Sequence, residues 1–283
     1  MHETIDASNA NANSDTTDAA VRAFTSTPFY AALGRALARR GMKVETLCDV
    51  HDAVARRLLA EYGAMFLATE RVRVPDVCVF RSATEVDEFQ RQAQPGTAVI
   101  GDASVELQPA ALAALLAARA EAQAAGLDIT PRDGAEAARR SYADTLRLWS
   151  SRVEPALAHW LAGGCITADD VAHVRALAPH EQTAAVLALE ARGLYCSKDF
   201  AKSILYSVAA PGASQHLALV AFDVAEFTDA AVRAILARHG WFQTVRRDLP
   251  HFTFLGVREK QLPDLGLSRF VEHGQTFWLP AVE

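Results

Sequence analysis

Long apolar runs and an excess of basic charge are both missing from this chain of 283 residues. No stretch approaches the ~20 consecutive apolar residues that a membrane-crossing helix needs, so we expect no membrane span. The 28 Lys and Arg residues are outnumbered by 34 Asp and Glu residues, and the formal net charge is −6. The sequence therefore lacks the electrostatic footprint of a protein that binds nucleic acid or an anionic membrane surface.

Cysteine is scarce as well. The chain has only Cys48, Cys78, Cys165 and Cys196, and none of them forms a CxxC pair. This spacing excludes the usual cysteine zinc sites. Because the four residues are scattered among apolar neighbours, we expect reduced, buried thiols. A disulfide remains an alternative.

A signal peptide is not recognisable at the N-terminus. Residues 1–19 are acidic and rich in Ala, Asn, Ser and Thr. They lack the basic start and the apolar core of a secretory leader, and their composition predicts disorder. The location is thus uncertain: cytoplasmic as the sequence stands, or periplasmic or extracellular if a leader has been removed or export is unconventional.

The rest of the chain has mixed secondary-structure signals. Apolar periodicity with start and stop residues predicts helices over 28–40, 52–62, 82–92, 108–125 and 228–239. Residues 141–149 predict a further helix, and 153–161, 168–177 and 180–191 predict three more. Short strands are predicted over 77–80, 97–101, 127–130, 217–224, 241–245 and 252–257. Many helices with a few short strands favour an α+β fold with a small, mostly antiparallel sheet.

Three potential metal ligands lie in the last third of the chain. They are His216, Asp223 and His251, and Asp248 stands three residues before the last of them. Catalytic zinc takes three N or O protein ligands and keeps one position for water. A hydrolytic site also needs a base that takes the proton of that water. Taken singly, each residue fits a packed histidine or a strand-end aspartate, whereas the combination favours a Zn²⁺ site with Asp248 as base.

The spacing restricts how these ligands meet. Residues seven apart on one regular strand point to opposite faces, so His216 must lie in the loop before the strand that ends near Asp223, or a bulge must intervene. Pro211 and Gly212 indicate such a loop. If the strand that begins near His251 is the neighbour of the first, Asp223 and His251 can face one ion.

The motif Ser214-x-His216-x-x-Leu219-x-Ala221-x-Asp223 resembles the SxHxxGxAxD signature of the zinc D-alanyl-D-alanine carboxypeptidases and dipeptidases, which share a fold with the N-terminal hedgehog domain. Asp248-Leu-Pro-His251 resembles the ExWH motif of that family. The resemblance implies that His216, Asp223 and His251 hold zinc and that Asp248 is the general base. The implied substrate is a short D-Ala-containing peptide, from peptidoglycan or its fragments.

A second element resembles the family's GYRSxxxQ segment. It implies that Arg140 stabilises the oxyanion, a role suited to a guanidinium that stays protonated; Arg132 is the alternative. Substrate contacts are expected from Ser214, Tyr142 and Tyr206. We expect residues 20–126 to form a helical or mixed N-terminal subdomain, and residues 127–283 a peptidase-like domain with a helical insertion at 150–203 that builds one wall of the cleft.

The sequence departs from the family pattern in the motifs themselves. Leu219 replaces the motif glycine, Asp248 the glutamate and Pro250 the tryptophan. A base that is one methylene shorter reaches less far toward the water, and displacements near 1 Å can cost about a hundredfold in rate. These departures support an alternative, a non-catalytic zinc- or peptide-binding module of the same fold. A third possibility is a cytoplasmic metallopeptidase that acts on other peptides.

Overall fold

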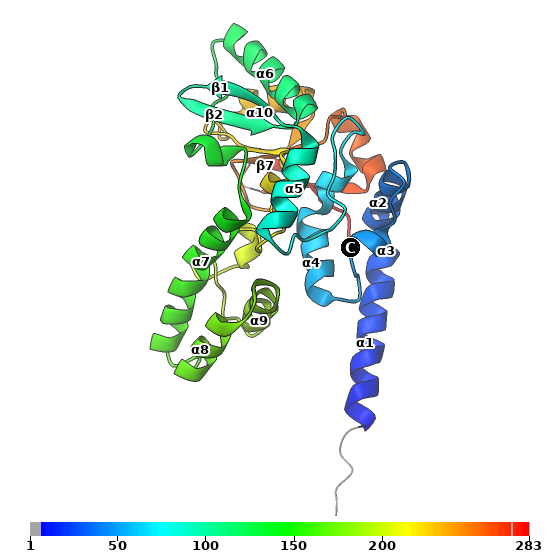
Figure 1. The fold of residues 1–283 in the computed structure, drawn as a ribbon, viewed down its shortest axis with the longest axis vertical. Coiled ribbons are helices and arrows are strands. Elements are labelled where there is room, and N and C mark those ends of the chain that lie inside the picture. The colour runs from blue at the N-terminus through cyan, green and yellow to red at the C-terminus, as the bar shows by residue number, and fades with distance from the viewer. Residues whose placement is uncertain (1–6, 273, 283) are drawn as a thin grey trace, which may run out of the picture.

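The computed structural model describes residues 7–272 and 274–282, which form ten α-helices and seven β-strands (Figure 1). The helices are α1 (Ala7–Thr25), α2 (Pro28–Ala38), α3 (Val44–Leu47), α4 (Ala53–Tyr62), α5 (Ala83–Ala93), α6 (Pro109–Ala124), α7 (Tyr142–Ala162), α8 (Ala168–Ala176), α9 (Pro179–Ala191) and α10 (Ala230–Arg238). The strands are β1 (Gly96–Ile100), β2 (Ala103–Leu107), β3 (Ala221–Asp223), β4 (Trp241–Phe242), β5 (His251–Phe254), β6 (Leu267–Glu272) and β7 (Gln275–Pro280). Every strand pairing is antiparallel, so the predicted α+β class is confirmed.

A small sheet with the strand order β3-β5-β4 carries two of the predicted metal ligands, Asp223 on β3 and His251 on β5. Phe222, Trp241 and Phe254 are almost completely buried, which explains why these strands read as continuous apolar runs. In the register of β3 with β5, Asp223 stands opposite His251. β3 and β5 are therefore neighbours, which is the condition under which Asp223 and His251 can face one ion.

The predicted strand over 217–224 is shorter than expected. A 3-10 turn at Gln215–Ala218 comes first, and β3 begins only at Ala221. Between them Leu219 has a left-handed backbone, with φ 57°. This conformation interrupts an extended chain, and it places His216 in the segment before the strand, as the parity argument required.

Two apolar cores meet at α4. Along this helix Val54, Leu58 and Tyr62 belong to one cluster, while Ala55 and Leu59 belong to the other. Residues four apart lie on one helix face, so adjacent faces of α4 serve different cores. The larger core contains residues from both the 20–126 and the 127–283 segments, which are therefore packed against each other rather than separated by a linker.

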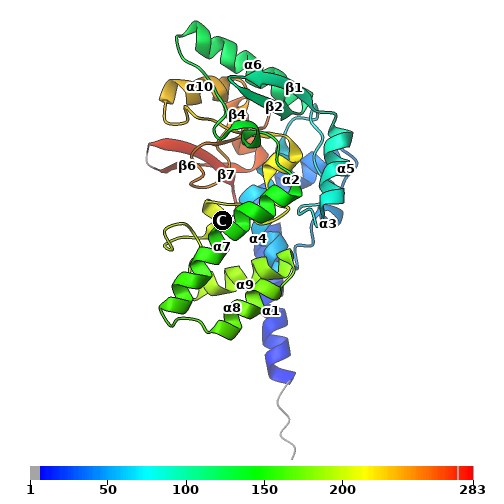
Figure 2. The same cartoon turned by 60° about the vertical axis from the view of Figure 1, so that its left-hand side comes forward.

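The smaller core holds the helices α7, α8 and α9, which form a lobe of their own beside the sheet (Figure 2). Two separate helices were expected over 141–161, but α7 runs through Pro155 without a break. Trp149, Val153 and Leu157 on one face of α7 are buried in this core. This packing spans the proline and offsets the backbone hydrogen bond that it removes.

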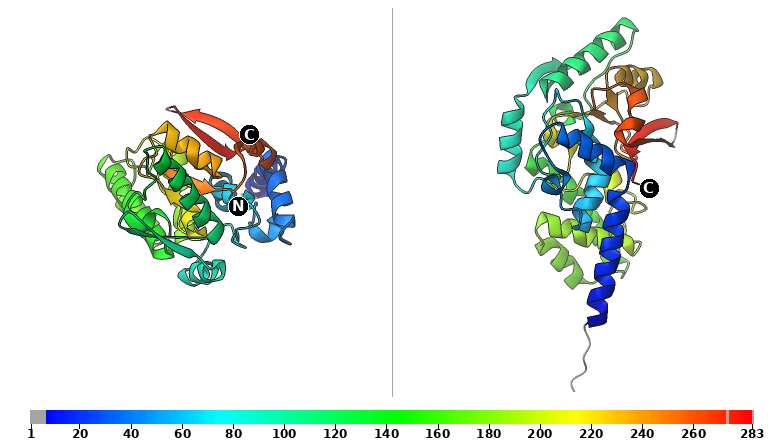
Figure 3. Two further views of the ribbon diagram at one scale, coloured as in Figure 1. Left: turned by 90° about the horizontal axis from the view of Figure 1, so that it is seen from above. Right: turned by 90° about the vertical axis from the view of Figure 1, so that its right-hand side faces the viewer.

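The N-terminal expectation needs correction. Residues 7–19, for which we predicted disorder, lie in α1, while residues 1–6 lie outside the described residues. Alanine recurs through this stretch and favours a helix. At its end Phe24 is buried beside Phe29 and Tyr30, which ties α1 to the body. The helix extends well beyond the rest of the molecule (Figure 3).

The cysteine expectation is wrong for one pair and incomplete for a third residue. Cys48 and Cys78 form a disulfide, with a Cα–Cα distance of 5.2 Å. The Cys78 N–H donates to the Leu47 carbonyl at 2.9 Å, a tertiary contact that the separation of 30 residues does not reveal. Of the other two cysteines, Cys196 is buried but Cys165 is exposed.

Several short elements differ from expectation. Residues 77–80 and 127–130 are not strands, and the C-terminal tail contains the hairpin of β6 and β7. Between β3 and β4, α10 begins after Asp229, whose side chain caps it, rather than after Thr228. Within the described part of the chain, none of the helices has the length and hydropathy required to cross a bilayer.

Candidate metal centre

The three predicted ligands converge on one point. His216 comes from the 3-10 turn before β3, Asp223 ends β3 and His251 begins β5. One ligand atom from each lies within 4.8 Å of the others. Both histidines are buried, with 1% and 4% of their surface exposed. The antiparallel register and the left-handed Leu219 together produce this convergence.

The geometry of the triangle suits a small cation. His216 Nε2 lies 3.1 Å from His251 Nδ1. The Asp223 Oδ1 atom lies 3.1 Å from His251 Nδ1 and 3.3 Å from His216 Nε2. Ligands at about 2.0–2.1 Å from a tetrahedral zinc ion are roughly 3.3 Å apart. The three atoms can therefore hold a metal ion with only small adjustments.

In each histidine ring, the nitrogen that faces away from the cluster (the outer nitrogen) lies within hydrogen-bond distance of a protein oxygen. His216 Nδ1 faces the Ala138 carbonyl at 3.0 Å, and His251 Nε2 faces Gln215 Oε1 at 2.9 Å. The Gln215 amide orientation is itself set, because its Nε2 donates to the Tyr62 carbonyl at 2.8 Å. Partners of this kind are what metal-binding histidines use to fix their tautomer and ring orientation.

These contacts dictate where the protons are. Both outer nitrogens face acceptors, so both carry the N–H in the neutral rings. The inner nitrogens of His216 and His251 then present lone pairs to each other and to the Asp223 carboxylate. Three acceptors at these distances repel one another unless a cation lies among them.

A proton is a poor candidate for that cation at neutral pH. Burial, reinforced by Arg140 and His251 and opposed by Asp223, lowers the pKa of His216 to about 4. Burial by itself would raise the pKa of Asp223, but its electrostatic interactions and hydrogen bonds with His216 and His251 hold it well below its ordinary value. His216 is therefore a neutral imidazole beside an anionic Asp223, which is the state in which these two groups bind a metal ion.

Arg140 binds the carboxylate oxygen of Asp223 that does not face the histidines. Its Nη2 donates to Asp223 Oδ2 at 2.5 Å, and its Nε donates to the Glu136 carbonyl at 3.1 Å. The Oδ2 atom is thereby occupied, and Oδ1 is left to face the histidines. In this geometry Arg140 orients a ligand, while its Nη1 has no partner among the described residues.

Asp248, the predicted base, lies beside the three ligands. Its carboxylate accepts no hydrogen bond from any described residue, and it lines the cavity in front of the cluster. Burial raises the pKa of Asp248 to about 6, with Asp223 acting in the same direction and His251, Arg140 and Arg132 opposing it. A free carboxylate with a raised pKa is a better proton acceptor than an ordinary one.

A cavity of about 420 Å³ opens onto the cluster. Its lining includes six cationic side chains against three carboxylates: Arg132, Arg140, Arg152, Lys198, Lys202, Arg247, Asp133, Asp223 and Asp248. The residues 150–203 contribute Arg152 and Lys198, so this segment builds one wall. The excess of positive charge favours a ligand that carries a carboxylate or another anionic group.

The remaining predicted residues divide into two groups. Ser214 and Tyr206 line this cavity, and so does the alternative arginine, Arg132. Tyr142 is not among the lining residues; it lies on the first turn of α7 and packs against the larger core. Sequence reasoning missed Gln215, although its place next to His216 was a signal that could have drawn attention to it.

No family model matches the chain, and no curated protein or solved structure matches it significantly. The geometry of the site and the motif resemblance are therefore what indicate a function.

Proposed function

We propose that this protein is a zinc-dependent peptidase that hydrolyses a short D-Ala-containing peptide, as a D-alanyl-D-alanine carboxypeptidase or dipeptidase acting on peptidoglycan or its fragments. The observation that carries the proposal is the triangle of His216, Asp223 and His251, in which one potential ligand atom from each residue lies 3.1–3.3 Å from the other two. The motif resemblance supports the choice of reaction. Along the sequence, the three ligands and Asp248 follow one another in the same order as the ligands and the base of this peptidase family.

The residues have separate roles in this proposal. Bound zinc would supply Lewis acidity and lower the pKa of a water molecule toward ~7. Asp248, whose carboxylate is otherwise unbonded, takes the proton of the attacking water and returns it to the leaving amine. His216, Asp223 and His251 hold the ion, and Gln215 and the Ala138 carbonyl orient the two imidazole rings.

In this proposal the substrate is recognised by the cationic side chains that line the cavity in front of the cluster. Arg140 is already paired with Asp223, so only its Nη1 is left to stabilise the oxyanion. Lys198 and Arg152 line the same cavity, and neither forms an ion pair with any described carboxylate. A free C-terminal carboxylate of a peptide is the natural partner for such a wall.

The first test is a paired measurement on the purified protein. We expect about one zinc ion per chain by elemental analysis, and release of D-Ala from a D-Ala-D-Ala peptide that a chelator abolishes. His216→Ala should remove the metal, whereas His173→Ala, which changes an exposed histidine on α8, should not. Full metal content in His216→Ala would contradict the ligand assignment.

The base is tested by Asp248→Ala. We expect turnover to fall by 10²-fold or more, the size typical of a lost general base, while zinc stays bound. Asp133→Ala is the matched control, because Asp133 lines the same cavity with 87% of its side chain exposed. Equal loss of activity in both variants would show that charge in the cavity matters, rather than a base.

A non-catalytic zinc- or peptide-binding module is the second candidate. One observation favours it: the arginine expected to stabilise the oxyanion is held in an ion pair with a ligand carboxylate. This reading predicts bound zinc and measurable peptide binding with no D-Ala release. The same paired measurement therefore separates the two candidates.

A further inference from the structure

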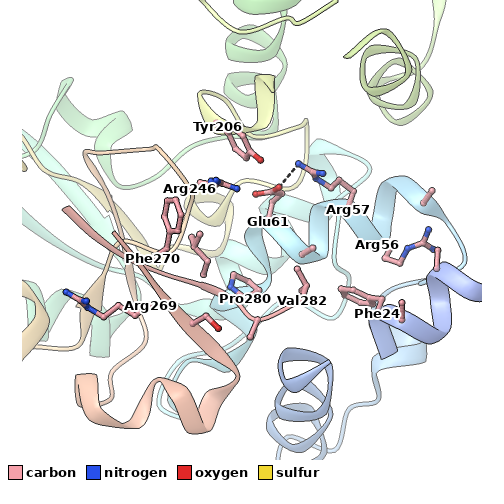
Figure 4. Close-up of a pocket in the computed structure, with 17 residues that line it drawn as sticks. Phe24, Arg56, Arg57, Glu61, Tyr206, Arg246, Arg269, Phe270, Pro280 and Val282 are labelled. Carbon is pink, nitrogen blue, oxygen red and sulfur yellow. Dashed lines mark ion pairs between the residues drawn. The ribbon is translucent and has the colours of Figure 1, made fainter. Parts of the chain in front are cut away.

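A second cavity, of about 780 Å³, has Tyr206 among its lining residues (Figure 4). Tyr206 lines both this cavity and the one in front of the metal cluster. The consecutive residues Arg246 and Arg247 line one cavity each, and their guanidinium groups lie 5.5 and 5.9 Å from the Tyr206 ring. The second cavity thus adjoins the candidate metal centre through a single aromatic side chain.

The second cavity has an apolar body and a cationic end. Phe24, Pro280 and Val282 belong to the apolar part, together with several alanines. Four arginines line it against one carboxylate: Arg56, Arg57, Arg246, Arg269 and Glu61. The difference of four cations and one anion leaves a formal charge of +3, so an anionic group is favoured there.

Three of these arginines are already engaged. Arg56 donates to the Val50 carbonyl, Arg57 pairs with Glu61 at 2.7 Å, and Arg269 donates to Thr276 Oγ1 at 3.3 Å. Arg246 differs, since it forms no ion pair with any described carboxylate. Its Nε is buried and has no hydrogen-bond partner among the described residues.

Arg246 is nevertheless held in place. Its guanidinium lies 4.7 Å from the Phe270 ring centre and 5.5 Å from that of Tyr206. Contacts with two aromatic rings restrict the side chain without using its N–H donors. An arginine that is positioned but unpaired is prepared to bind a carboxylate through its planar fork.

We propose that this cavity binds an acidic residue of a longer peptide whose reacting end lies at the metal centre, with Arg246 as the anchor for the carboxylate. The inference rests on the proposed peptidase function and specifies its substrate as an extended, acidic peptide. The apolar surface takes the uncharged part of the same segment. Glu61 competes for Arg246, because its charge lies close enough to interact with that guanidinium.

The test measures binding rather than turnover. The zinc-loaded Asp248→Ala protein is titrated with N-acetyl pentapeptides that end in D-Ala-D-Ala, with Glu at the first, second or third position, each compared with the matching Gln peptide. We expect one Glu peptide to bind about tenfold more tightly than its Gln partner, as a charge-assisted hydrogen bond allows. Arg246→Gln should remove this difference and leave the Gln peptides unaffected.

Two further variants sharpen the result. Arg269→Gln removes the same charge from an exposed position in the same cavity, and it should preserve most of the Glu preference. Glu61→Gln should increase that preference, because it removes the competing carboxylate. A preference that survives in Arg246→Gln, or that falls equally in Arg269→Gln, would overturn the role of Arg246.

The inference and the proposed function can fail separately. If no Glu peptide binds more tightly than its Gln partner, the acidic subsite is wrong, whether or not the wild-type protein releases D-Ala. If the wild-type protein releases no D-Ala but the Glu preference and its loss in Arg246→Gln are found, the subsite stands and the peptidase reaction is wrong. Arg246→Lys, which retains the charge without the planar fork, should retain only part of the preference.

Discussion

At the scale of single residues, the state of the metal cluster depends on side chains that would not bind the ion. Gln215 Oε1 accepts from His251 Nε2 and also from the Thr253 hydroxyl. Its amide nitrogen donates to the Tyr62 carbonyl at 2.8 Å. The glutamine is only 1% exposed, so each of these bonds is protected from water. One residue thereby fixes a ring nitrogen that faces away from the ion.

Replacing Gln215 with Ala should weaken zinc binding. Loss of such an outer partner typically costs ~10–100-fold in metal affinity, because His251 is then free to change tautomer and orientation. The measurement is a competition titration with a chelator of known affinity. Thr183→Ala is the control, since Thr183 is similarly buried but its hydroxyl donates to the Pro179 carbonyl within α9. Unchanged zinc affinity in Gln215→Ala would contradict the orienting role.

A different residue, Cys196, contributes to the dependence of stability on alkaline pH. Burial, followed by the charge of Glu190, raises the pKa of Cys196 to about 12. In the unfolded chain this thiol has an ordinary pKa of about 8.5. Above that pH the unfolded form loses the proton while the folded form keeps it. The unfolded state then binds fewer protons, so stability falls as pH rises.

We expect Cys196→Ala to flatten this dependence. The wild-type protein should lose up to ~1.4 kcal/mol per pH unit more than the variant between about pH 9 and 11. The quantity to compare is the slope of unfolding free energy against pH in urea titrations with reductant. The difference between the two proteins cancels the titration of lysines and tyrosines. Parallel slopes would show that Cys196 is not protected from ionisation.

At the scale of elements, the path into β3 is the feature that makes the site. The 3-10 turn at Gln215–Ala218 ends at Leu219, whose left-handed backbone redirects the chain before Ala221. The Leu219 carbonyl accepts from the Gln108 N–H at 3.0 Å, which fixes the turn. A glycine suits this conformation best. The leucine is retained at a conformational cost while its side chain is fully buried.

Burial of the Leu219 side chain stabilises the fold, whereas its left-handed backbone destabilises it. These opposing effects predict an unusual order of stability for the alanine and glycine variants of this residue. Leu219→Ala loses the buried side chain, at a cost of about 2–5 kcal/mol, and retains the left-handed strain. Leu219→Gly loses the same packing but removes strain of about 1–2 kcal/mol. We therefore expect the glycine variant to be more stable than the alanine variant in denaturant titrations. The opposite order, usual for glycine in regular structure, would contradict this account of the turn.

At the scale of the whole molecule, the two cores are connected through α4 and the segment that precedes it. Cys48 lies just before α4 and joins Cys78 through the disulfide. Cys48 belongs to the larger core, and Cys78 packs at the edge of both. Closing this loop restricts the unfolded chain. A disulfide also favours an oxidising compartment, which suits a substrate located outside the cytoplasm.

Thiol counting checks this pairing. Without reductant, we expect the native protein to react with a maleimide once, at the exposed Cys165, and the denatured protein twice. Full reduction should yield four reactive thiols. Replacing Cys48 and Cys78 together by Ala should lower the unfolding free energy by roughly 3 kcal/mol. Four thiols in the denatured, unreduced protein would show that the pair is not joined.

The sequence by itself determined the elements that repeat a local pattern. Helices such as α2 and α6 follow from apolar periodicity with a proline at the start, and both are local properties of the chain. The parity of the strand positions required His216 to precede β3. The chemical types and order of His216, Asp223 and His251 also indicated a metal site.

Only the tertiary structure decided how those residues face one another. The pairing of Asp223 with His251 depends on a register between strands that are distant in sequence. The roles of Gln215 and the Ala138 carbonyl depend on contacts 36 and 78 residues apart. The Cys48–Cys78 pair, the unbroken α7 and the second cavity at Arg246 likewise arise from long-range packing. Local patterns carry no information about such contacts, because their energies come from side chains that meet only in the folded chain.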